Sequence, residues 1–266
     1  MALLVKVLLE NRLGEGQDKT LKVKPGLSLL LEDETSRVLF DTGPDDSFMQ
    51  NARRMGVSLS DLTATVLSHG HYDHCGGVPW LPDNSRIICH PQIGKSRYSA
   101  LTAVGRSWKI KKLSREIDYS RHRMEYSRQP LIIGERFMWS GEIDVAHPRA
   151  YGVLEGERQQ TDYIADEGVL IYRSPRGLVI ICGCGHRGLI DTISHCQKIT
   201  GVRQIHAIIG GLHLRTAPPW EIRRLKQFLH QQKVEKVLAC HCTGSWGRWW
   251  LSADSAPATG DTIVLE

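Results

Sequence analysis

Three histidines and one aspartate within six residues constrain this chain more than any other feature. They stand at His69, His71, Asp73 and His74, directly after the β-branched run at residues 62–68. Buried imidazole and carboxylate groups need partners, and a shared metal site satisfies all four. These ligand types suit zinc, manganese, iron or cobalt better than calcium or magnesium. A run that follows a strand also lies where α/β folds place their sites, so the sequence predicts a transition-metal site here.

The spacing of apolar residues predicts an α/β chain that is strand-rich at first and alternates strands with helices later. The length of 266 residues suits one domain, which we predict to span residues 1–266. Two packed sheets with helices outside fit this order. We expect strands near residues 5–11, 27–33, 37–41, 62–68, 87–90, 206–211, 235–240 and 261–266, a hairpin at 168–186, and helices at 45–55, 188–200, 219–231 and 245–252.

A polar, basic segment at about residues 95–128 interrupts this pattern, and we predict it to be a partly helical insertion. It holds ten basic residues against three acidic ones, a net charge of about +7. It could be a solvated helical face, or a flap that attracts an anionic substrate to the site. No nucleic-acid-binding motif accompanies the charge. A small anionic molecule is therefore the expected partner, rather than a nucleic acid.

The composition is that of a globular protein, with 41% hydrophobic and 24% charged residues. No apolar run reaches the roughly 18 residues of a membrane span. The apolar start contains Lys6 and Glu10 and lacks the marks of a signal peptide, so we expect a first strand, a cytoplasmic location and no membrane partner. The seven cysteines should then be reduced. Cys240 and Cys242 lack the second half of a zinc finger.

Several further motifs resemble one known family. They are the strand and Asp-Thr-Gly turn at residues 38–43, the opening Val-Leu-Leu-Glu-Asn at 7–11, and the later runs at 183–186, 210–214 and 241–244. With the His-x-His-x-Asp-His run, they resemble the metallo-β-lactamase-fold superfamily. Within it they resemble the subgroup typified by the dihydropterin–ribofuranosylaminobenzene-phosphate synthase. The resemblance implies an α/β (α+β) fold, a four-layer αββα sandwich.

The resemblance also implies ligand roles for two neighbouring metal ions. His69 and His71 match the histidines that bind the first ion, and Asp73 and His74 match ligands of the second. His241 matches the family's last histidine, also a ligand of the second ion. Asp41, in the Asp-Thr-Gly turn, matches the aspartate that orients the metal loop from behind.

The chain departs from the family pattern after residues 178–182, where most members carry an aspartate that bridges the two ions. Cys184 and His186 stand there instead. Either could replace the bridge, or His186 could complete the first site. We favour His186 as a ligand and Cys184 as a non-bridging neighbour. His213 is predicted to lie in the cleft as a ligand or proton donor, and His147 is a further candidate ligand.

The remaining histidines and several cysteines have ordinary structural interpretations. We expect structural or surface positions for His90, His122, His195, His206 and His230, and small core positions for Cys182, Cys196 and Cys240.

Two divalent transition-metal ions, zinc first with manganese or iron as alternatives, would supply hydroxide at neutral pH. We therefore expect a metal-dependent hydrolase acting on an ester or phosphoester, with Asp73 and His213 as catalytic residues. The alternative is a group transferase acting on a phosphorylated pterin or sugar precursor, as in the synthase subgroup. A non-hydrolytic redox di-metal protein is a third, less favoured class. The fold hosts many reactions, so it does not select the substrate.

Overall fold

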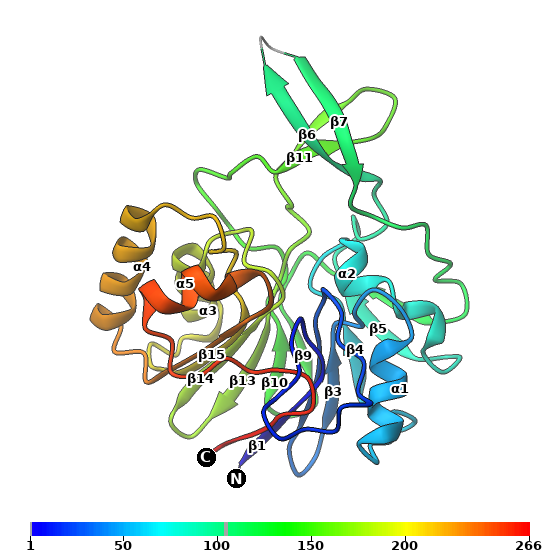
Figure 1. Ribbon diagram of the computed structural model, residues 1–266, viewed down its shortest axis with the longest axis vertical. Coiled ribbons are helices and arrows are strands. Elements are labelled where there is room, and N and C mark those ends of the chain that lie inside the picture. The colour runs from blue at the N-terminus through cyan, green and yellow to red at the C-terminus, as the bar shows by residue number, and fades with distance from the viewer. Residues whose placement is uncertain (1, 104–105) are drawn as a thin grey trace.

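The computed structural model describes residues 2–103 and 106–266, and two stacked β-sheets occupy its centre (Figure 1). Within the described residues the first sheet has seven strands in the order β17-β1-β2-β3-β4-β5-β8. Strands β3, β4 and β5 run parallel. The strands of this sheet are β1 (Leu3–Leu9), β2 (Ser28–Glu32), β3 (Arg37–Phe40), β4 (Ala64–Val66), β5 (Arg86–Cys89), β8 (Arg123–Tyr126) and β17 (Thr262–Leu265).

The second sheet, counted over the same residues, has six strands in the order β16-β15-β14-β13-β10-β9. They are β9 (Leu131–Ile133), β10 (Phe137–Trp139), β13 (Leu170–Ser174), β14 (Gly177–Cys182), β15 (Ile205–Gly211) and β16 (Lys236–Cys240). Strands β14, β15 and β16 are parallel, with Cys182 opposite Gly210 and Gly211 opposite Cys240. Their carboxyl ends therefore meet at one edge, where the loops that follow them come together.

Helices cover the outer face of each sheet. Helices α3 (Leu189–Thr200), α4 (Pro219–Gln231) and α5 (Gly244–Leu251) pack on the second sheet, and α1 (Ser47–Arg54) and the short α2 (Tyr72–Cys75) lie beside the first. Helix α4 shows why: Pro219 begins it, and Ile222, Leu225 and Leu229 form one buried stripe. None of the helices in the described part of the chain is long and apolar enough to cross a membrane.

The hydrophobic core confirms the predicted αββα sandwich. One cluster joins the inner faces of the two sheets and includes Phe40 from the first and Trp139 and Ile181 from the second. A second cluster lies between the second sheet and its helices, and a third lies between the first sheet and α1. Apolar side chains thus fill the three interfaces that four layers require.

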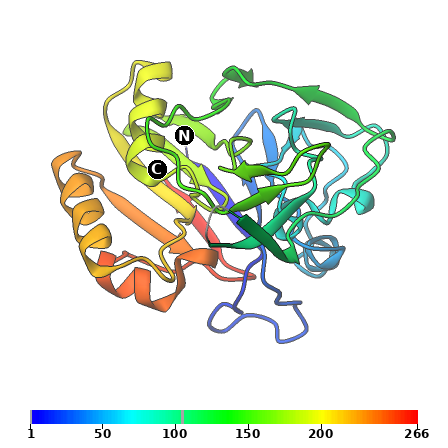
Figure 2. The same ribbon diagram turned by 90° about the horizontal axis from the view of Figure 1, so that it is seen from above.

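The prediction of helix in the basic insertion is wrong. The segment forms the antiparallel strands β6 (Arg97–Ala103) and β7 (Arg106–Lys112), followed by β8. The first two join β11 (Gly152–Leu154) and β12 (Gln160–Asp162) in a four-stranded sheet, counted over the described residues. Most side chains of β7 are exposed. Its sequence therefore lacks the regular alternation of apolar residues that would predict a strand. Figure 1 shows that this small sheet stands apart from the sandwich at one end, and in the view from above in Figure 2 its strands lie across the rest of the molecule.

Candidate metal centre

Four loops that follow strands of the two sheets bring the predicted metal residues together. The loop after β4 carries the run at residues 69–74, and the loop after β14 carries Cys184 and His186. His213 follows β15, and His241 follows β16. The first sheet thus supplies one wall of the centre and the second sheet supplies the other.

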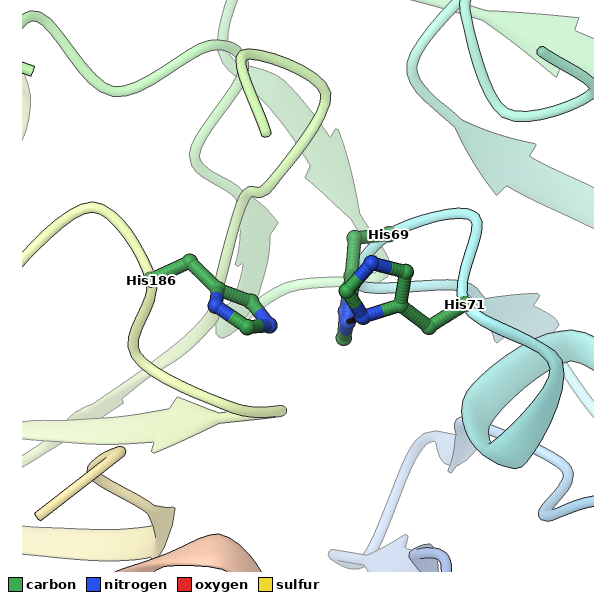
Figure 3. A group of neighbouring side chains, drawn as sticks. All are labelled: His69, His71 and His186. Atoms are coloured by element: carbon green, nitrogen blue, oxygen red, sulfur yellow. Dashed lines mark hydrogen bonds between the residues drawn. The ribbon is translucent and has the colours of Figure 1, made fainter. Parts of the chain in front are cut away.

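The first group of candidate ligands is His69, His71 and His186, whose rings point toward one another (Figure 3). His69 Nε2 lies 3.0 Å from His71 Nδ1, and the His186 ring centroid is 5.0 Å from the centroids of both other rings. Within the described residues, the buried His71 Nε2 and both ring nitrogens of His186 have no hydrogen-bond partner. Buried orphan nitrogens are costly, and three imidazoles fit a zinc-type ion.

Burial sets the protonation of this first group. It lowers the pKa of His69, His71 and His186 well below the usual value, and the neighbouring charged groups lower it further. All three imidazoles are therefore neutral at pH 7, which is the form that binds a metal ion.

The second group is Asp73, His74 and His241. His74 Nε2 lies 3.2 Å from His241 Nε2, and Asp73 Oδ2 lies 3.9 Å and 3.7 Å from these two nitrogens. The other ring nitrogens are already used, because Nδ1 of His74 donates to Asp41 at 2.7 Å and Nδ1 of His241 donates to Asn11 at 2.9 Å. Two Nε2 lone pairs therefore face each other, an arrangement that requires a proton or a metal ion between them.

The two histidines of this group differ in their affinity for a proton. Burial and His74 lower the pKa of His241 to about 3. Burial opposes protonation of His74 as well, but the Asp41 and Asp73 carboxylates raise its pKa to about 9. At neutral pH the metal-free site therefore holds one proton, on His74, which a bound cation would displace.

Asp41 orients both groups from behind, as the resemblance implied. Its Oδ1 accepts the Ser68 N–H at 2.7 Å, and its Oδ2 accepts Ser68 Oγ and His74 Nδ1, each at 2.7 Å. Ser68 Oγ in turn accepts from His69 Nδ1 at 2.9 Å. This chain of hydrogen bonds uses Nδ1 of both histidines and directs their Nε2 atoms toward the centre, which is the usual role of a carboxylate behind a metal centre.

Three residues of the centre adopt the left-handed backbone region, namely Asp41 at φ 58°, His213 at φ 51° and His241 at φ 52°. Non-glycine residues in this region cost about 1 kcal/mol or more. Such strain is typical of sites where side-chain direction matters more than stability.

Cys184 lies between the two groups. Its sulfur, one nitrogen of His69 and one nitrogen of His74 all lie within 4.8 Å of one another, so it is close to both candidate sites. The same sulfur is 3.5 Å from Nδ1 of His213. The geometry thus brings both Cys184 and His186 into the centre, with His186 as a member of the first group.

Cys242 is a site residue that our sequence reasoning missed. It donates to the Cys184 carbonyl at 3.0 Å and accepts the His213 N–H at 3.2 Å. Burial raises the pKa of Cys242, but hydrogen bonds with Cys184 and His213 outweigh burial and lower it below the usual value. The available signal was a second thiol next to the matched His241.

His71, Asp73, His186 and His241 of these two groups line a cleft of about 410 Å³. His213, Asp73, Lys111 and Arg215 are among its walls. Four basic residues of the insertion lie near the cleft in sequence or space. Lys111 reaches the cleft, whereas Lys109 pairs with Glu155. Lys112 pairs with Glu116, and Arg115 donates to the Pro44 carbonyl.

The base of the β6–β7 hairpin contacts the metal loop directly. The Tyr72 N–H donates to the Leu113 carbonyl at 2.8 Å, and Leu113 N–H donates to the Arg97 carbonyl at 2.8 Å. Arg97, one of the ten basic residues of the insertion, is buried and paired with Asp162 and Asp166. The insertion is therefore joined to the centre through its base.

The other sequence candidates lie elsewhere. His147 is exposed and lines an adjoining cavity, and no candidate metal group among the described residues includes it. Among the predicted structural histidines, His90 pairs with Glu142, His195 with the Ser140 carbonyl and His206 with Glu235, and His230 is exposed. His122 is buried, and its ring nitrogens have no hydrogen-bond partner among the described residues. Cys182, Cys196 and Cys240 are buried in the hydrophobic core.

Two sequence comparisons agree with this geometry. The sequence pattern of the metallo-beta-lactamase superfamily matches residues 21–123. A curated relative, the 7,8-dihydropterin-6-methyl-4-(beta-D-ribofuranosyl)-aminobenzene-5'-phosphate synthase of Methanocaldococcus jannaschii, is 29% identical over 237 residues. That alignment covers 82% of this chain and 81% of the synthase.

Solved structures extend the match to the whole chain. Tm1679, described as a metal-dependent hydrolase of the beta-lactamase superfamily, has a TM-score of 0.82 at 26% identity and covers 99% of this chain and 98% of its own. The metallo-beta-lactamase fold protein YhfI of Bacillus subtilis, with a TM-score of 0.56, 13% identity and 99% of both chains covered, supports the fold alone. The four-layer architecture, the convergence of the four loops and the sequence and structure matches together identify this chain as a protein of the metallo-β-lactamase fold. In sequence it resembles the synthase subgroup.

Proposed function

We propose that this protein is a dinuclear metal-dependent hydrolase of small anionic esters or phosphoesters. The observation that carries the proposal is the assembly of the six predicted ligands into two groups along one cleft: His69, His71 and His186, and Asp73, His74 and His241. The likeness to a solved metal-dependent hydrolase over nearly the whole chain supports it. Lys111 and Arg215 in the cleft wall favour an anionic substrate.

Two divalent ions would lower the pKa of bound water and stabilise negative charge on a substrate oxygen. The imidazole and carboxylate ligands favour zinc for this role. The chain's own residues would supply the remaining functions. Asp73, a carboxylate in the cleft wall, would accept the proton released by the attacking water. His213 would donate a proton to the leaving oxygen, with its Nδ1 held beside Cys184. Lys111 and Arg215 would bind the substrate's negative charge.

Metal analysis tests the first part of the proposal. Protein purified without chelator should contain about two transition-metal ions per chain. Chelation should abolish activity, and added zinc or manganese should restore it. The assay should screen phosphodiesters, phosphomonoesters, lactones and sulfate esters. Protein that contains no metal and takes up no added zinc or manganese would overturn the proposal.

A second candidate function is group transfer, as the identity to the synthase favours. One structural observation supports it: a cavity of about 310 Å³ adjoins the cleft and shares Tyr151, His186 and His213 with it. Such a cavity has room for a second reactant. Reaction in ¹⁸O-water separates the candidates, because hydrolysis places the label in the product, whereas transfer needs an acceptor and leaves the transferred group unlabelled.

The basic residues of the cleft should act selectively on charged substrates. Because hydrogen bonds to charged groups contribute about 1.5–3 kcal/mol, Lys111→Ala and Arg215→Ala should each lower kcat/KM for an anionic substrate by about tenfold or more. Rising salt should reduce the wild-type value, since exposed charges are screened within about 10 Å at 0.1 M.

Lys112→Ala is the matched control, because this lysine lies on the same strand but pairs with Glu116 outside the cleft. Its kcat/KM should stay near the wild-type value. An equal loss on neutral and anionic substrates in the Lys111 and Arg215 variants would contradict anion binding by this wall.

A further inference from the structure

Two consecutive buried carboxylates, Asp166 and Glu167, lie just before strand β13 and have no part in the chemistry described above. Asp166 is fully buried, and Glu167 is 1% exposed. Neither is among the described residues that line the cleft. A buried carboxylate is costly unless hydrogen bonds or a counter-ion compensate it, so the partners of these two side chains show what they do.

Asp166 contacts the metal loop. Its Oδ2 accepts the Gly70 N–H at 2.8 Å, between His69 and His71, and its Oδ1 forms an ion pair with Arg97 Nη2 at 2.7 Å. Position 70 has room only for glycine, because a Cβ atom there would lie 2.3 Å from the Ile93 carbonyl oxygen. Asp166 therefore fixes the backbone between the first two histidines of the metal run.

Glu167 contacts the opposite loop. Its Oε1 accepts the Gly185 N–H at 2.8 Å and its Oε2 accepts the Arg187 N–H at 2.7 Å, so the two oxygens bind on both sides of His186. Gly185 has φ +80°, which a side chain would disfavour. Both carboxylate oxygens are thus used to hold the turn that presents His186.

The adjacent backbone completes the connection. Gly168 N–H donates to the Ser68 carbonyl at 3.0 Å. Residues 166–168 therefore contact the first loop on both sides of His69 and the second loop on both sides of His186. The two loops belong to different sheets, and this one short segment joins them.

We propose that Asp166 and Glu167 are positioning residues that set the distance between the two metal-bearing loops, so that His69, His71 and His186 converge before an ion binds. This inference rests on the proposed metal centre. Partners behind metal ligands fix ligand orientation, and their loss typically costs about 10- to 100-fold in metal affinity. Neither carboxylate touches the reacting groups, so neither is a catalytic residue.

Isosteric variants test the idea. Asp166→Asn and Glu167→Gln keep the shape of each side chain but turn one acceptor oxygen into an NH₂ group, which cannot accept a backbone N–H. Zinc titration against a competing chelator, with cobalt absorption spectra of the substituted protein, measures the two binding steps separately. In each variant one dissociation constant should rise about 10- to 100-fold, while the other changes less than about threefold.

Asp162→Asn is the matched control for Asp166. Asp162 pairs with the same Arg97 through Nη1 at 2.6 Å, and its other hydrogen bond goes to Ile164 N–H rather than to the metal loop. This variant should lower the melting temperature but leave both zinc constants near the wild-type values. Equal zinc weakening in Asp162→Asn and Asp166→Asn would show that Asp166 acts only as a counter-ion of Arg97.

Glu167→Gln keeps the test decisive if Asp166→Asn fails to fold, because Glu167 is outside the Arg97 ion pairs. Unchanged zinc constants in a folded Glu167→Gln protein would overturn the positioning role. Wild-type protein that binds no zinc would instead overturn the proposed function itself. If the wild-type protein binds two zinc ions and both variants bind zinc equally well, the positioning role would be refuted while the proposed function would stand.

Discussion

His186→Ala should lose about one metal ion per chain and at least about 100-fold in activity. His186 supplies one of three imidazoles in the first group, and its two ring nitrogens are buried without hydrogen-bond partners among the described residues. Removal of a residue that hydrogen-bonds to a metal ligand typically lowers metal affinity or activity by about 10- to 100-fold. Removal of a ligand itself should lower them more. Elemental analysis beside the steady-state rate measures both effects.

Cys184→Ser is the companion variant, because Cys184 occupies the same turn as His186. We expect this variant to keep both ions, because each group has three candidate ligands even when the thiol is not counted. The first group has three imidazoles, and the second has two imidazoles and a carboxylate. A Cys184→Ser protein that loses metal, beside a His186→Ala protein that keeps two ions, would assign the ligand to the thiol. The position of the Cys184 sulfur near both His69 and His74 makes this comparison informative.

Asp73→Ala should lower the rate by at least about 100-fold while the fold is retained. Its carboxylate is a candidate ligand of the second ion and the proposed proton acceptor, and general bases contribute about 10²- to 10⁴-fold. The Asp73 side chain is 23% exposed, so its removal leaves no large cavity in the core. Asp118→Ala, at an exposed aspartate of the insertion, is the control. Wild-type activity in Asp73→Ala would place the proton acceptor elsewhere.

Most of the sandwich was predictable because its strands and helices carry strong local signals. Strand β14 is buried along its whole length and follows a Pro-Arg-Gly turn, and α4 begins at a proline and buries a regular stripe. The small sheet carries no such signal. The partners of β6 are β7 and the distant β11, and the exposed faces of β7 show no alternation of apolar residues. Its pairing depends on contacts that a local pattern does not contain.

The candidate ligands that cluster in sequence were predictable. The single residues that hydrogen-bond to them from distant positions were less so. The run at residues 69–74 stands out because unusual residue types are concentrated there. Asn11, which accepts from His241, lies 230 positions away from it. Tyr151, whose hydroxyl donates to the His186 carbonyl, comes from the irregular segment before β11. Such partners become visible only when the chain has folded around them.

The pairing of β1 with β17 has a consequence for synthesis of the protein in the cell. Strand β1 is synthesised well before its outer partner at residues 262–265. The candidate ligands are spread in the same way, from the run near residue 70 to His241. A growing chain on the ribosome therefore carries only part of the donor set until His241 has been added. Because metal affinity requires the complete set of donors, we expect a chain that stops before His241 to bind fewer ions than a chain that includes it.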